Sequence, residues 1–200
     1  MSHQPSIECR VVINRLLEGA AVFAAAVFIL TLTSLAQAKD LPDADGAELA
    51  DIVARYEAAF LERNHWAIGA AMPPRVLEQY VASRGALDME RELWIALFVA
   101  DSEELDRQLG SVIEAFALDL ANARAEETSD GTPYVVIPST TVVQARTGER
   151  VRISSPYVAL LDDGTWYLLN VGLGGPNLSI EEAYPSFEGI EFGFATHELL

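Results

Sequence analysis

The chain has 200 residues, half of them hydrophobic, and its 13 basic and 30 acidic residues give a formal net charge of −17. Contacts with nucleic-acid phosphates need clusters of lysine and arginine, so this acidic composition argues against binding to nucleic acid, and equally against docking on anionic lipid. The excess of acidic groups is expected to favour solubility and to attract cations or a basic partner.

The first 38 residues have the order of parts that is typical of a secretory signal peptide. Two arginines precede an apolar run over residues 16–35, which ends in the small-residue sequence Ala-Gln-Ala at 36–38. We expect cleavage after Ala38. The alternative is an uncleaved membrane anchor, because residues 19–38 match the roughly 20 residues that a membrane-spanning helix needs. Both interpretations place the rest of the chain in the periplasm or outside the cell.

Residues 39–200 are expected to form a single acidic domain, because their length is typical of one domain with its own core. Residues 1–38 contain two basic and two acidic residues, so residues 39–200 keep the whole charge of −17. The single cysteine, Cys9, lies in the N-terminal segment. The domain is therefore expected to have no disulfide and no thiolate metal site.

Three helices are expected in the first half of this domain. Apolar residues at helical spacing predict a helix over 46–63, with Asn64-His65-Trp66 as its exit. Pro73-Pro74 suits the first turn of a second helix, which Gly85 ends. Asp88 is the expected cap of a third helix. The residues expected to be buried on the third helix are Leu93, Trp94, Leu97 and Phe98.

The second half has the pattern of an antiparallel meander, with turn sequences at short and regular intervals. The strongest of these turn signals is Asp162-Asp163-Gly164, which is typical of a tight hairpin. Beyond the sheet, Ser179 is expected to cap a short helix before Pro185, and the apolar tail is expected to pack on the domain, with a short edge strand. The expected strands cover residues 111–127, 134–144 (bent at Pro138), 151–161 and 166–171.

This order predicts an α+β fold in which N-terminal helices pack on a curved four-stranded antiparallel sheet of cone-like form, with a short C-terminal helix and tail. Two features of the sequence resemble a known fold. One is helix 46–63, which ends in Asn64-His65-Trp66. The other is the hairpin from Tyr157 to Leu168, with its Gly-Thr-Trp-Tyr sequence. Over residues 46–172 the chain resembles the nuclear transport factor two-like superfamily, a cystatin-like α+β cone. The resemblance is to an exported bacterial member, and it implies a sheet that wraps the first helix.

Two residues are candidates for acid/base catalysis. Asp119 lies between small alanines in the expected first strand, and a carboxylate that faces the interior of a cone would have a raised pKa, which suits a general base. Members of the ketosteroid-isomerase type in the superfamily that the chain resembles use a carboxylate in the cavity. No local motif aligns Asp119 with that position, so the role is not carried over to it. We favour the alternative, in which Phe116 faces inward and Asp119 points to water. His65 is more readily explained as a helix-end residue, and no second histidine has metal-ligand spacing.

Aromatic residues are the candidates for lining a ligand cavity, although residues of this type are more often plain core. We expect a non-catalytic exported domain that binds a small apolar molecule or a protein of the cell envelope. Two alternatives stay open: an isomerase- or dehydratase-like enzyme, and a structural module that forms a homodimer through an open sheet face. No metal or cofactor is expected. The ligand-binding candidates are Tyr56, Trp66, Tyr134 and Trp166, with Tyr157 as a further aromatic residue.

Overall fold

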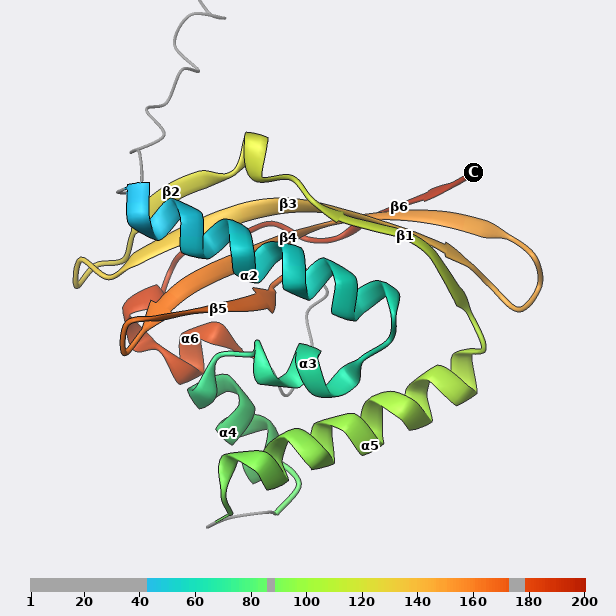
Figure 1. The fold of residues 1–200 in the computed structure, drawn as a ribbon, viewed down its shortest axis with the longest axis horizontal. Helices are drawn as coiled ribbons and strands as arrows, with labels where there is room; N and C mark the ends of the chain where they lie inside the picture. The colour runs from blue at the N-terminus through green and yellow to red at the C-terminus, as the bar shows by residue number, and fades with distance from the viewer. Residues whose placement is uncertain (1–42, 86–88, 173–178) are drawn as a thin grey trace, which may run out of the picture. The chain divides into compact units, whose positions relative to one another are not determined.

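The computed structural model describes residues 43–85, 89–172 and 179–200 (Figure 1). Residues Lys39–Leu200 form a compact unit of their own. The expected signal peptide and the expected cap at Asp88 lie outside the described residues. In the part of the chain that is described, no helix is both long enough and apolar enough to cross a membrane.

In the described residues, four α-helices come before the sheet, and those expected near 46–63 and after Pro73-Pro74 are present. The expected exit of the first helix is instead the start of another. The side chain of Asn64 accepts a hydrogen bond from the backbone N–H of Ala67 at 3.1 Å and so caps this extra helix. The helices are α2 (Asp43–Leu61), α3 (His65–Ala70), α4 (Pro74–Ala82) and α5 (Arg91–Leu109).

The expected burial of the third helix, α5, is only partly correct. Trp94, Leu97 and Phe98 pack against the core, but Leu93 is 52% exposed. The residue of this helix that is buried is Ile95. Only one face of α5 packs against the core, and Leu93 lies outside that face.

The helices pack with a curled antiparallel sheet that forms a half-barrel, so the expected α+β fold is confirmed (Figure 1). The main strand order is β1-β3-β4-β5; β2 also pairs with β3, and β6 also pairs with β4. The tail therefore ends in the expected edge strand. The strands are β1 (Val112–Leu118), β2 (Arg124–Glu127), β3 (Pro133–Gln144), β4 (Arg150–Asp162), β5 (Thr165–Asn170) and β6 (Thr196–Leu199).

The expectation of one continuous strand over 111–127 is wrong. Strand β1 ends at Leu118, and a short 3-10 turn, η1 (Leu120–Asn122), separates it from β2. The carboxylate of Asp119 accepts hydrogen bonds from the backbone N–H and the side-chain amide of Asn122, at 3.2 and 2.6 Å. Aspartate and asparagine offer the backbone such local partners in place of the strand ladder, and this explains the interruption.

The two faces of the sheet carry two separate hydrophobic clusters, because successive strand residues point to opposite sides. On the concave face, Val135 and Ile137 pack against α2 residues that include Leu49 and Val53. On the other face the sheet packs against α4, α6 (Ile180–Ala183) and η2 (Pro185–Phe187). As expected, Ser179 caps α6, accepting from the backbone N–H of Glu182 at 3.3 Å. The tail residues Phe187, Ile190 and Phe192 join this second cluster, whereas Phe194 is 88% exposed.

Candidate ligand-binding cavity

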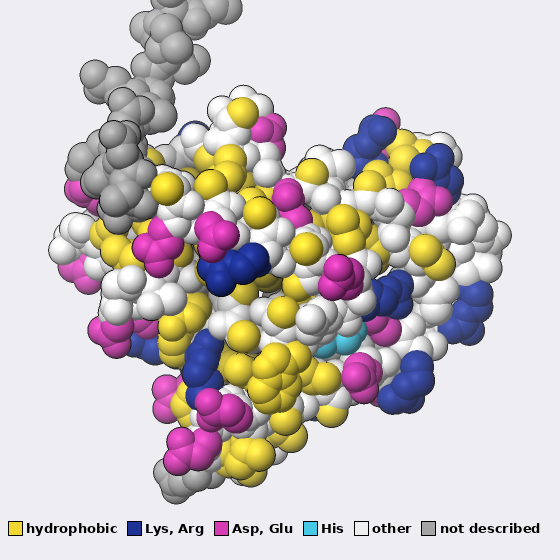
Figure 2. All heavy atoms as spheres, viewed as in Figure 1, with side chains coloured by type: hydrophobic (Ala, Val, Ile, Leu, Met, Phe, Trp, Pro, Cys, Tyr) yellow, Lys and Arg dark blue, Asp and Glu magenta, His cyan; other side chains and the backbone are white. Residues whose placement is uncertain are grey.

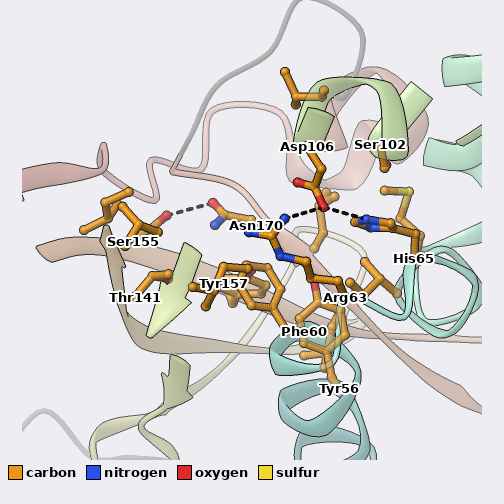
Figure 3. Close-up of a pocket in the computed structure, with 18 of the residues that line it drawn as sticks. Tyr56, Phe60, Arg63, His65, Ser102, Asp106, Thr141, Ser155, Tyr157 and Asn170 are labelled. Carbon is orange, nitrogen blue, oxygen red and sulfur yellow. Dashed lines mark hydrogen bonds and ion pairs between the residues drawn. The ribbon is translucent and has the colours of Figure 1, made fainter. Parts of the chain in front are cut away.

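A cavity of about 480 Å³ lies between the concave face of the sheet and three helices, α2, α3 and α5 (Figure 3). Pockets that bind small molecules have volumes of roughly 300–1,000 Å³ and are mostly apolar with a few polar groups. This cavity has that character. Its apolar lining includes Phe60, Ile68, Met72, Phe98, Leu105, Ile113, Val143, Ile153, Leu168, Leu169 and Val171.

Strand alternation and helix periodicity explain how residues from separate elements meet in this wall. Thr141 on β3, Ser155 on β4 and Asn170 on β5 all lie on the concave face, on the same side of the sheet as the residues that pack against α2. Ser102 and Asp106 are one helical turn apart on α5 and face the sheet from the opposite side.

Gly69 brings α3 close to α5 on the helical side of the cavity. A Cβ atom at this position would lie 2.9 Å from Cδ1 of Phe98 and 3.2 Å from Cγ2 of Ile95, so only glycine fits without displacement. The close contact of the two helices holds Phe98 and His65 in the same wall.

A polar cluster of three side chains lies at the more exposed rim of the cavity. Nε2 of His65 lies 3.0 Å from Oδ2 of Asp106, and Nη1 of Arg63 lies 3.2 Å from the same oxygen. Arg63 also donates to the backbone carbonyl of Ser111. Because a carboxylate can only accept, Nε2 of His65 is the donor in this contact, and in the tautomer that carries its one proton there, Nδ1 is left as an acceptor. Figure 2 shows a histidine at the surface over α3, with basic and acidic side chains beside it.

A second polar group, which is partly buried, lies on the wall formed by β4 and β5. The hydroxyl of Ser155 donates to Oδ1 of Asn170 at 2.7 Å, and the backbone N–H of Gly172 donates to the same oxygen at 3.0 Å. Tyr56 and Tyr157 also line the cavity, and their rings meet edge to face with centroids 5.7 Å apart. Burial is the main cause that raises the pKa of both tyrosines, well above its usual range for Tyr56, so both hydroxyls stay protonated at neutral pH.

The aromatic candidates from the sequence are divided between the cavity and other places. Tyr56 and Tyr157 line the cavity. Trp66 is 48% exposed and does not line it. Tyr134 points to the other face of the sheet, where its hydroxyl bonds to Glu126 at 2.6 Å. Trp166 is buried in the core beneath α2.

The two catalytic candidates are also separated. His65 lies in the cavity wall beside Asp106, whereas Asp119 is exposed, caps η1 and does not line the cavity. The carboxylate of the cavity is therefore Asp106, which sequence reasoning missed. Its only signal was its place one helical turn after Ser102, on the side of the helix that carries Phe98.

Comparison with known protein families, curated proteins and solved structures found no match to this chain. Within residues 43–85, 89–172 and 179–200, no group of three histidine, cysteine, aspartate or glutamate side chains is arranged to hold a metal ion.

Proposed function

We propose that residues 39–200 form an exported domain that binds a small, mainly apolar molecule in the cavity between the helices and the sheet. The observation that carries this proposal is the cavity itself, with its volume of about 480 Å³ and its largely apolar lining. Polar side chains are the minority of its lining. A few fixed polar groups in an apolar site are the usual means of orienting a small ligand.

Membership of a superfamily and export from the cell are part of the same proposal. The half-barrel sheet and the helix α2 against its concave face support membership of the nuclear transport factor two-like superfamily. The order of basic, apolar and small residues over 1–38 supports export. Mass spectrometry of the N-terminus of the protein recovered from cells distinguishes cleavage after Ala38 from a retained anchor.

A pair of variants at neighbouring strand positions tests binding in the cavity. Thr141 lines the cavity, whereas Thr140 is exposed and points to the opposite face of β3. The probe is the uncharged fluorophore N-phenyl-1-naphthylamine, added to the purified full chain. We expect one saturable site, which Thr141→Phe blocks and Thr140→Phe leaves unchanged.

The two variants carry the same N-terminal apolar segment, so binding of the probe to that segment affects both equally. A fluorescence titration that is the same for Thr141→Phe, Thr140→Phe and the unaltered chain would contradict the proposal. Circular dichroism of the variants checks that the added ring has not unfolded the sheet.

A second candidate function is acid/base catalysis, and the contact of His65 with Asp106 inside the cavity favours it. A histidine oriented by a carboxylate, with its other nitrogen left as an acceptor, is equipped to remove a proton from a bound molecule. The probe is 5-nitrobenzisoxazole, whose N–O bond breaks as a base takes the proton from its carbon. We expect faster ring opening than in buffer, and loss of this acceleration in His65→Gln. Equal rates for the two proteins would exclude His65 as a base.

A further inference from the structure

Strand β4 has two successive neighbours on the edge that faces away from β3. Strand β5 pairs with residues 157–162 of β4, and β6 pairs with residues 151–154 (Figure 1). The backbone N–H of Ala195, just before β6, donates to the carbonyl of Gly172, just after β5, at 2.9 Å. Strand β6 therefore continues the wall that β5 gives to the cavity.

The register of the strands places two side chains of β6 on the concave face, because residues directly opposite each other in paired strands point to the same side. Ile153 lines the cavity and is opposite His197. Val143 also lines the cavity; it is opposite Val151, which in turn is opposite Leu199. His197 and Leu199 thus lie on the cavity side of the sheet, and Leu199 is 74% exposed there.

The residue between them supports this orientation. Glu198 forms an ion pair with Arg152, its partner in the register, at 2.5 Å. Successive strand residues point to opposite sides, so this ion pair lies on the outer face of the sheet. It holds β6 against β4 without placing a charge beside the cavity.

The apolar surface along β4 is longer than the cavity itself. From Tyr157 to Ile153 the cavity follows β4 for about 14 Å, at the usual rise of a strand, and the surface reaches about 20 Å at Val151 and Leu199. A compact ligand that fills the volume of about 480 Å³ leaves Leu199 uncovered. A long and narrow molecule can fill the cavity and cover Leu199 as well.

The charges along this path favour hydrocarbon. The charged side chains that line the cavity, Arg63 and Asp106, come from the helical side and pair with each other. Beyond the cavity, the side chains that the path meets on β4 and β6 include Val151 and Leu199. Each additional CH₂ group that is buried there should improve the affinity by up to about fourfold.

We propose that the ligand class is a molecule with a long unbranched hydrocarbon chain, which runs from the cavity along β4 and ends against Leu199 of β6. This inference rests on the proposed binding function. Leu199 is then a specificity-determining residue for chain length, and β6 is part of the binding site.

Two alcohols with the same head group test the inference in the full chain. 1-Octanol and 1-dodecanol each displace N-phenyl-1-naphthylamine from the unaltered protein, from Leu199→Ser and from Leu200→Ser. Leu200 is the matched control, because it is the next residue, is 49% exposed and points to the outer face. We expect Leu199→Ser to weaken the binding of 1-dodecanol about three- to tenfold and to leave that of 1-octanol unchanged. Leu200→Ser should change neither.

The outcomes separate this inference from the proposed function. The same ratio of the two Kd values in Leu199→Ser and the unaltered protein would overturn the inference and leave the binding function standing. A fluorophore that binds at one saturable site but is displaced by neither alcohol would do the same. Absence of that saturable site would overturn the two together.

A second measurement needs no variant and so does not depend on how Leu199→Ser affects the pairing of β6. Hydrogen–deuterium exchange in the peptide that covers residues 196–200 should be slower with saturating 1-dodecanol than with saturating 1-octanol, because only the longer chain reaches β6. Equal exchange with the two alcohols would also overturn the inference.

Discussion

Tyrosine hydroxyls are prominent among the polar groups that this fold buries. Each of the affected side chains has burial as the first cause of its raised pKa, and several also donate to a carboxylate. Tyr80 is an example: burial, followed by its hydrogen bond to Asp101, raises its pKa to about 12. The tyrosines with raised pKa values are Tyr56, Tyr80, Tyr134, Tyr157 and Tyr184.

These shifts predict a loss of stability at alkaline pH. In the unfolded chain the hydroxyls ionise near the usual pKa of about 10, but in the folded chain they ionise later. Their contribution to stability is therefore complete below pH 10 and is lost as the pH rises through the raised values. We expect tyrosinate absorbance at 295 nm to rise together with the loss of circular dichroism. Ionisation of these tyrosines near pH 10 with the fold intact would refute the prediction.

The sequence could predict some residues of the cavity but not the contacts between them. Helical spacing placed Tyr56 on the apolar stripe of the first helix, and the strand pattern placed Tyr157 in the sheet. The contact of His65 with Asp106 joins residues 41 positions apart, and no local pattern encodes it. Because the rim forms only when α2, α3 and α5 pack together, its chemistry could not be predicted from the sequence.

At the scale of elements, the sequence predicted the turns and helix caps that depend only on neighbouring residues. Asp163 and Gly164 both have positive φ, 49° and 75°, which is the conformation that the tight hairpin turn requires. Ser179 caps its helix through its own side chain. The short helix α3 was missed because six residues are too few to show periodicity, and the strand break at Asp119 was missed because apolar residues continue past it.

The contact between α3 and α5 gives a prediction at this scale. Gly69→Ala places a methyl group 2.9 Å from the ring of Phe98 and should lower the free energy of unfolding by about 1–2 kcal/mol, the cost of overpacking less a gain in helix propensity. The control is Gly46→Ala in α2, where an added Cβ would meet no side chain and no other element within 4 Å, and stability should rise by about 0.5–1 kcal/mol. Urea unfolding measures both changes. Equal effects of the two substitutions would show that the helices do not meet at Gly69.

At the scale of the molecule, both faces of the sheet are covered, each by different elements. Helix α2 covers the concave face, and the segment with α6 and η2 covers part of the other face, where Phe187 packs against Tyr134. The expected homodimer through an open sheet face stays a prediction, and the C-terminal segment already occupies part of that face. The cavity is the region where the helices and the concave face stand apart.

The central claim is that a small apolar molecule binds in this cavity, and hydrogen–deuterium exchange of the full chain with and without N-phenyl-1-naphthylamine tests it most directly. The cavity wall comes from segments far apart in the sequence, so a ligand there must protect several peptides together. We predict slower exchange in peptides that cover residues 56–68, 98–106 and 153–157, and no such change in Thr141→Phe. Unchanged exchange in these peptides, or protection confined to residues 1–38, would contradict the claim.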